Sequence, residues 1–159
     1  PATPLPTAPT RRREQVRELT PRTRGWSLSA IIAKLNAYLV GWDGFFRICT
    51  PGVERVIQST DAHIRRRLRA IVLQHWKTKR TTARRLIRLG VKPRTAWRKV
   101  YEGRKSIWAL SHDPVVDRGL RNAYFAERGL VSLLERFAAR WAAILAPAQL
   151  SLMLGPARS

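Results

Sequence analysis

The sequence predicts an all-α fold, and three observations support this prediction. Apolar residues recur at spacings of three and four through several segments, which is the periodicity of an amphipathic helix. Serine, glycine and proline residues stand where such segments begin and end. No segment alternates apolar and polar residues over the length of a strand, so the sequence predicts no β-sheet.

The N-terminal part is expected to contain a linker and a short helix. The opening residues, PATPLPTAPT, are rich in proline, threonine and alanine, a composition typical of a flexible linker. RRREQVREL follows and predicts a short polar helix that ends before Pro21, because the residue preceding a proline disfavours helical backbone angles. Residues 1–25 are therefore assigned to this Pro-rich linker and helix.

The next helix is expected to begin after Ser27, whose side chain can cap its first turn. Two glycines, Gly41 and Gly44, lie within its apolar pattern. They indicate a close approach of another element or a bend, or else a helix end near residue 41. The apolar stripe of this helix predicts a buried face that contributes the core residues Leu35, Trp42 and Phe46.

A long helix is expected over residues 53–77, after the chain-breaking sequence TPG. On one side, Arg66, Arg69 and Lys77 would face solvent or an anion. Leu73 is an apolar residue on this charged side and has no assigned role. The opposite side is an apolar stripe that we expect to pack against the helix at 28–46, and it consists of Ile64, Leu68, Ile71, Val72 and Trp76.

Two short helices are expected within residues 81–100. Gly90 can end the first of them and Pro93 can begin the second. Trp97 in the second helix is expected to be a core residue.

The C-terminal part is predicted from weaker patterns. Residues 120–145 predict one or two helices interrupted at Gly129, and the chain after Pro147 is expected to be loosely ordered. We place one helical domain at 26–136 and a divergent Ala- and Leu-rich tail at 137–159.

The charge of the chain points to a polyanionic partner. Lysine and arginine number 31 against 10 acidic residues, which gives a net charge of +21. Residues 62–112 contain 16 of these cations and a single acid, Glu102. Such an excess of one sign repels itself unless an anion neutralises it, so nucleic acid is the expected partner. Arginine predominates, and its planar guanidinium suits bidentate contacts with phosphate.

Signatures of catalysis are scarce. The aspartates include no adjacent pair and no Tyr-x-Asp-Asp motif, so a polymerase palm with two metal-binding carboxylates is not expected in this chain. Asp113 and Asp117 are four residues apart and could share a helix face with His112, a geometry that could hold a divalent cation in a small nuclease. In the alternative, Asp113 is the charge at a helix N-terminus beside Pro114. We expect no enzyme activity, cofactor or metal.

The single cysteine, Cys49, excludes an internal disulfide, so a reducing compartment is expected, cytoplasmic or organellar. No apolar run approaches the roughly 20 residues of a membrane span. The opening residues lack the basic start and apolar stretch of a secretory signal. Neither a membrane partner nor secretion is expected.

Residues 81–100 also allow a DNA-binding interpretation. They have the pattern of a helix-turn-helix, with Gly90 in the turn and Trp97 in a recognition helix that would enter a major groove. This alternative predicts a dimer, a palindromic DNA site, and contacts from Arg94 and Arg98.

Four segments taken together are more specific than any one of them. LNAYLVGWDGFFRI is followed by HIRRRLRAIVLQHWK, then by TTARRLIRLGV, then by WALSHDPVVDRGLRNAYFAERGLVSL. In this order and spacing they resemble the maturase-specific region, often called domain X, of group II intron reverse transcriptases, over residues 28–134. The sequence departs from that family at His63, where tryptophan is usual, and at Ser106 and Ile107, where Gly-Pro is usual.

The resemblance implies a helical thumb-like bundle that binds structured group II intron RNA and stabilises it so that it self-splices. The chemistry would belong to the RNA. The chain would be the C-terminal part of such a reverse transcriptase, lacking the polymerase domain, and a separate polymerase half could be its partner. The oligomeric state is left open. The cations expected to contact RNA are Arg65, Arg66, Arg67, Arg69, Lys77, Lys79, Arg80, Arg84, Arg85, Arg88, Lys92, Arg94 and Arg98.

Overall fold

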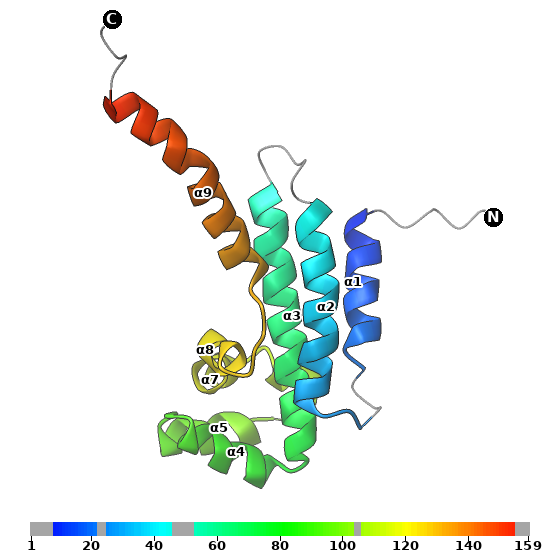
Figure 1. Cartoon of the computed structure of the whole chain (residues 1–159). Coiled ribbons are helices and arrows are strands. Elements are labelled where there is room, and N and C mark those ends of the chain that lie inside the picture. Colours follow the sequence, from blue (N-terminus) through cyan, green and yellow to red (C-terminus); the bar gives the residue numbers. More distant parts are fainter. Residues whose placement is uncertain (1–7, 22–24, 46–52, 104–105, 155–159) are drawn as a thin grey trace, which may run out of the picture.

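The fold is all-α, as predicted. The computed structural model describes residues 8–21, 25–45, 53–103 and 106–154 (Figure 1), and within these ranges it contains nine helices and no strand. None of the helices in these ranges has both the length and the apolar character needed to cross a membrane.

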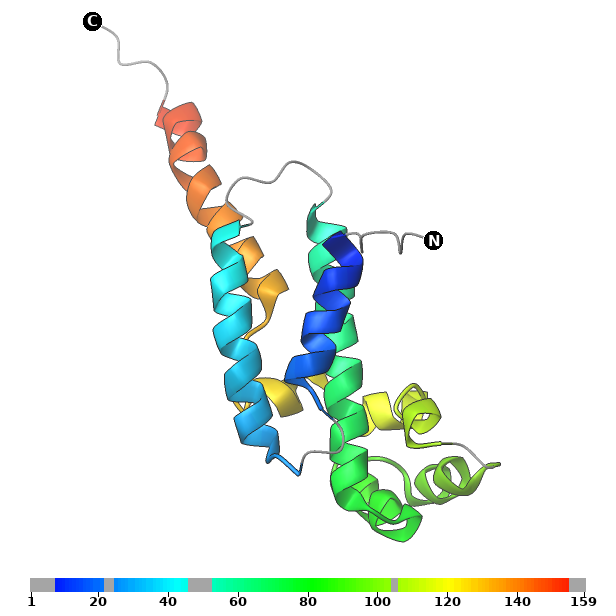
Figure 2. The same ribbon diagram turned by 90° about the vertical axis from the view of Figure 1, so that its right-hand side faces the viewer.

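Three helices stand side by side and form the body of the molecule (Figures 1 and 2). They are α1 (Ala8–Leu19), α2 (Leu28–Phe45) and α3 (Val53–Trp76). The Ser27 hydroxyl accepts a hydrogen bond from the backbone N–H of Ala30 at 3.2 Å, which confirms the predicted cap of α2. Because α2 continues to Phe45, the possible helix end near residue 41 is not found.

Helix α3 is the central element, since it packs against α1, α2, α4, α6 and α9. Its predicted apolar stripe is buried from Ile64 to Trp76, and the predicted packing against α2 is confirmed. Leu73 is buried as well, at 2% exposure, because neighbours cover α3 on more than one side. The helix is therefore a core element at its C-terminal end rather than a two-sided surface helix.

A helical hairpin follows α3 directly. It consists of α4 (Lys79–Arg88) and α5 (Pro93–Tyr101), and we call residues 79–101 the α4–α5 hairpin. The predicted signals hold: Gly90 has a left-handed φ of 92° in the turn, and Pro93 occupies the first turn of α5. Thr78 caps α4, its hydroxyl accepting from the backbone N–H of Thr81 at 3.2 Å.

Three short helices link the hairpin to the last helix. They are α6 (Ile107–Leu110), α7 (Pro114–Gly119) and α8 (Asn122–Ala126). Helix α7 packs against both helices of the hairpin. A Cβ atom at Gly119 would lie 2.6 Å from a methyl carbon of Leu86, so glycine permits this close approach.

The last helix, α9 (Leu133–Leu154), runs through Pro147 and extends past the end of the three-helix body (Figures 1 and 2). Its start follows the predicted interruption at Gly129, where φ is 84°. The tail after Pro147 is thus helical as far as Leu154, although the sequence shows little pattern there. The Asn36 side chain on α2 fixes the preceding loop, donating to the carbonyl of Gly129 at 2.6 Å and accepting from the N–H of Val131 at 3.0 Å.

The predicted core residues have different outcomes. Leu35, Leu68 and Trp76 are buried, as expected. Phe46 and the side chain of Trp42 lie outside the described residues. Trp97 is the exception, because it is exposed on α5.

Candidate nucleic-acid interface

The α4–α5 hairpin carries a dense group of exposed cations. Its inner face is buried through small and aliphatic side chains, including Ala83, Leu86, Ala96 and Val100. The outer residues are mostly exposed and basic, since an amphipathic helix turns its charged residues away from the core. The exposed cations in and just before the hairpin are Lys77, Lys79, Arg80, Arg84, Arg85, Arg88, Lys92, Arg94 and Arg98.

Few acids neutralise this surface. Within the described part of the hairpin and its flanks, the carboxylate of Glu102 pairs with the Lys99 ammonium at 2.7 Å. Aromatic rings order two other cations without neutralising them: the Arg85 guanidinium lies 5.7 Å from the Trp76 ring centre, and the Lys79 ammonium 5.8 Å from that of Tyr101. The hairpin therefore keeps its positive charge available to an external anion.

Arg67 is buried, at 8% exposure, and is not displayed on the outer surface of α3. Its guanidinium donates to the hydroxyl and to the carbonyl oxygen of Thr20, the latter at 2.7 Å, and more weakly to the carbonyl of Arg17 at 3.5 Å. The physical reason is the docking of α1 along α3, which covers this position. Arg67 fastens the C-terminal end of α1 to the body.

Arg69 is also engaged internally. Its side chain is 13% exposed, pairs with the Asp117 carboxylate at 2.9 Å and donates to the carbonyl of Leu120 at 3.1 Å. Arg65 is 19% exposed and lies 3.8 Å from the Asp61 carboxylate. Among the arginines at 65–69, Arg66 is thus the one whose side chain is exposed.

Trp97 is not a core residue. It is 37% exposed, and its ring stacks on that of Tyr101, which is 51% exposed, with centroids 5.8 Å apart and planes inclined by 29°. The buried face of α5 is built by Ala96 and Val100, whose small side chains let α4 and α5 approach, so the large indole is left at the edge. The two rings add a flat aromatic surface to the basic hairpin.

Sequence reasoning missed a second group of cations, on α1. Arg11, Arg13 and Arg17 are exposed on a helix that lies against α3. The available signal was the spacing of Val16 and Leu19, which place an apolar edge on an otherwise polar helix. Both of these residues pack into the core cluster.

The three residues of the alternative metal site have structural roles. The Asp113 carboxylate caps α7, accepting from the backbone N–H of Val115 at 3.1 Å. Asp117 pairs with Arg69, and the His112 ring meets the edge of Trp108 with centroids 4.8 Å apart. No three histidine, cysteine or acidic side chains converge on a common point in the part of the chain that is described.

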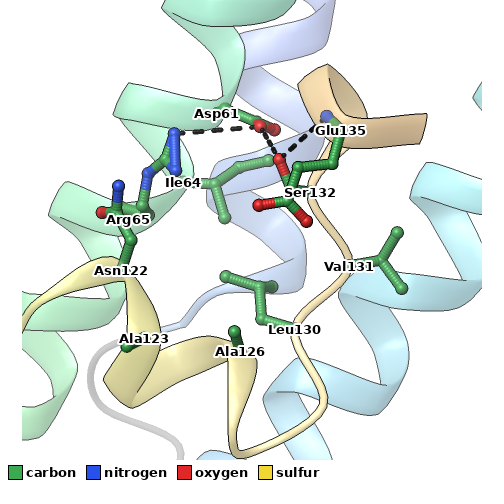
Figure 3. A pocket seen from close by; sticks show the side chains of 10 residues that line it. All are labelled: Asp61, Ile64, Arg65, Asn122, Ala123, Ala126, Leu130, Val131, Ser132 and Glu135. Carbon is green, nitrogen blue, oxygen red and sulfur yellow. Dashed lines mark hydrogen bonds and ion pairs between the residues drawn. The ribbon is translucent and has the colours of Figure 1, made fainter. Parts of the chain in front are cut away.

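A cavity of about 270 Å³ lies between α3, α8 and the start of α9 (Figure 3). Two carboxylates line it, those of Asp61 and Glu135. Asp61 is buried and accepts from the Ser132 hydroxyl at 2.9 Å and from the N–H groups of Leu133 and Leu134 at 3.3 Å each. These bonds satisfy backbone donors at the start of α9. The Asp61 carboxylate therefore anchors the start of α9.

Comparisons with curated proteins and with family models give different results. No curated protein shows significant similarity to the chain. A family model, described as the maturase-specific domain of group II introns, matches residues 10–90, which extend from α1 to the turn of the hairpin. The match begins before residue 28 and ends at Gly90, so the predicted bounds of 26–136 and the resemblance at 107–134 remain predictions. Because the match spans more than half of the 159 residues, the chain belongs to the family of group II intron maturase-specific domains.

Proposed function

We propose that this chain is an RNA-binding module that holds structured group II intron RNA in its folded form and so promotes its splicing. It would act beside a polymerase domain, in the same polypeptide or in a separate one, and the chemistry would belong to the RNA. The observation that carries the proposal is the α4–α5 hairpin, whose cations are exposed while Arg67 and Arg69 of α3 are engaged internally.

The proposed mechanism is electrostatic. Each arginine or lysine that reaches a phosphate releases condensed counterions, so the affinity should fall steeply as salt rises. Guanidinium groups can contact phosphates bidentately, and because the backbone of the hairpin is already folded, only their side chains have to be ordered on binding. The exposed rings of Trp97 and Tyr101 can add stacking with unpaired bases.

The test is a filter-binding titration of the protein against group II intron RNA at rising salt, with heparin and duplex DNA as competitors. We expect a steep salt dependence and preferential retention of intron RNA. A flat salt dependence, or equal competition by duplex DNA, would contradict the proposal.

A charge-matched pair of variants sharpens this test. Replacing Arg84, Arg85 and Arg88 with glutamine should lower the salt slope by about 3, because each lost phosphate contact contributes roughly 0.9. The same change at Arg55, Arg128 and Arg136, which are exposed outside the hairpin and α7, removes equal charge and should have a smaller effect. A splicing assay at a magnesium concentration low enough for splicing to depend on the protein should show the larger loss of activity in the hairpin variant.

A second candidate is DNA binding by the same hairpin. The observation that favours it is that α4 and α5 pack as two helices around a tight turn, with Arg94 and Arg98 exposed on the second. A footprint on a short palindromic duplex, lost on Arg94→Ala or Arg98→Ala, would support this candidate over RNA binding.

A further inference from the structure

A second basic site lies away from the hairpin, in a cavity between α1, α3 and α6. The cavity has a volume of about 560 Å³ and is lined by Arg17, His63, Arg67 and Trp108. Figure 2 shows α1 lying along α3, which brings Arg17 to residues that follow it by more than 45 positions in the chain. The volume lies in the range of small-molecule sites.

The charge of this cavity favours an anion. Arg67 is held in place by Thr20, so its positive charge is fixed at the wall. Arg17 lines the cavity from α1, and Arg13 and Arg66 are near enough to act on the same histidine. A phosphate entering here would meet the Arg67 guanidinium, which Thr20 already orients.

His63 supplies a polar group without a protein partner. Its Nε2 atom is buried and makes no hydrogen bond to any residue that the structure describes. Burial, followed by Arg67, Arg13, Arg17 and Arg66, lowers the pKa of His63, so its ring is neutral near pH 7. The Nε2 atom of a neutral imidazole can donate or accept one hydrogen bond, depending on the tautomer, and the edge of a nucleobase presents both kinds of partner.

Trp108 supplies an aromatic surface. The indole is partly buried, and its edge-to-face contact with His112 fixes its orientation. Nucleobases stack on such rings regardless of their identity. A bare phosphate would leave this ring and the buried nitrogen unused, so the cavity suits a nucleotide better than an inorganic anion.

We propose that the cavity formed by Arg17, His63, Arg67 and Trp108 binds a single unstacked nucleotide of RNA, with its phosphate toward the arginines and its base against Trp108. This inference rests on the proposed RNA-binding function and names the structural element that the module recognises, a bulged or flipped-out nucleotide. It assigns the body of the molecule a role in selecting RNA, while the hairpin supplies general affinity.

The test uses two RNA hairpins that differ by one bulged 2-aminopurine nucleotide. The protein should bind the bulged hairpin on the order of ten-fold more tightly than the fully paired one, since stacking of one base contributes that much. Trp108→Leu should remove this preference and leave binding of the paired hairpin unchanged, whereas Trp108→Phe should retain most of it. Trp141→Leu is the matched control, because Trp141 is an exposed tryptophan on α9.

Crosslinking provides a measurement that does not depend on a stable Trp108 variant. A 4-thiouridine placed at the bulge should crosslink to the peptide containing His63 or Trp108 in the unaltered protein. Crosslinks confined to Trp97 and Tyr101 of the hairpin would overturn the inference, as would equal affinity for the two hairpins. Salt-dependent binding of intron RNA with no preference for the bulge would refute the cavity alone, and preference for the bulge with no binding of intron RNA would refute the proposed function alone.

Discussion

Two arginine-rich runs of similar sequence, RRRLR at 65–69 on α3 and RRLIR at 84–88 on α4, have opposite fates in the structure. In the α3 run, Arg67 is buried against Thr20 and Arg69 is paired with Asp117. In the α4 run, every arginine is exposed. The difference arises because α3 is covered by several helices, whereas α4 has neighbours on one face only. A run with more arginines in the sequence therefore does not place more charge on the surface.

The largest effect should come from removing the buried member of the α3 run. Arg67→Met keeps much of the aliphatic stem but leaves the Thr20 carbonyl and hydroxyl without their donor, which should lower the free energy of unfolding by about 2–4 kcal/mol. Urea denaturation followed by circular dichroism measures it. Arg84→Met is the matched control on the hairpin and should change stability by no more than about 0.5 kcal/mol. Equal losses for the two variants would contradict the comparison.

The next effect concerns how the hairpin is attached. Gly119→Ala would place a methyl group against Leu86, which is fully buried and cannot move freely, so we expect a loss of about 1–2 kcal/mol in unfolding free energy. Gly41→Ala is the matched control, because that helical glycine has open space around its Cβ position and the change should stabilise by about 0.5–1 kcal/mol. Thermal unfolding should show a lower melting temperature for Gly119→Ala and a higher one for Gly41→Ala. A stabilised Gly119 variant would refute the close-approach explanation.

A smaller effect distinguishes Arg69, which is ion-paired, from Arg88, which is exposed. Arg69→Gln breaks the ion pair with Asp117 and should cost about 1 kcal/mol of stability, with less than a two-fold change in the RNA affinity of the folded protein. Arg88→Gln should do the reverse, leaving stability unchanged and weakening RNA binding a few-fold. Unfolding and RNA-binding titrations of both variants measure the two effects. A larger loss of affinity for Arg69→Gln than for Arg88→Gln would contradict this assignment.

The smallest effect is a pH dependence of the unfolding free energy that His63 on α3 should produce. Burial and the neighbouring arginines lower the pKa of His63 in the folded protein below the 6.5 of an unperturbed histidine. As the pH falls below 6.5 the unfolded chain therefore takes up this proton first, and the folded state loses stability. His63→Gln should flatten the decline in unfolding free energy between pH 7.5 and 5.5. His112, whose pKa burial also lowers, should leave a residual slope, and an unchanged slope in the His63 variant would contradict the assignment.

Most of the helices could be predicted because their signals are local. Ser27, Gly90, Pro93 and Gly129 each stand at the predicted boundary, and the stripe on α3 packs as its periodicity indicates. Helices α6 and α7 contain only four and six residues, too few for an apolar period to appear.

The environment of individual cations could not be predicted in the same way. Arg67 is buried by Thr20, 47 residues earlier in the chain, and no sequence pattern links the two positions. Trp97 was expected in the core because tryptophan is apolar, but the smaller Ala96 and Val100 form the contact surface of α5. In both cases the outcome depends on which helix docks where, and that information is tertiary.

The connection between α3 and α4 consists of Lys77 and Thr78, with Lys77 in a left-handed conformation at a φ of 59°. Two residues span at most about 7 Å, so the hairpin cannot swing independently of the long helix that carries it. The exposed cations on α1 and those on the hairpin are therefore held at a fixed distance from one another. An RNA would be selected by the distance between its phosphates, a property of its folded shape that no single base determines.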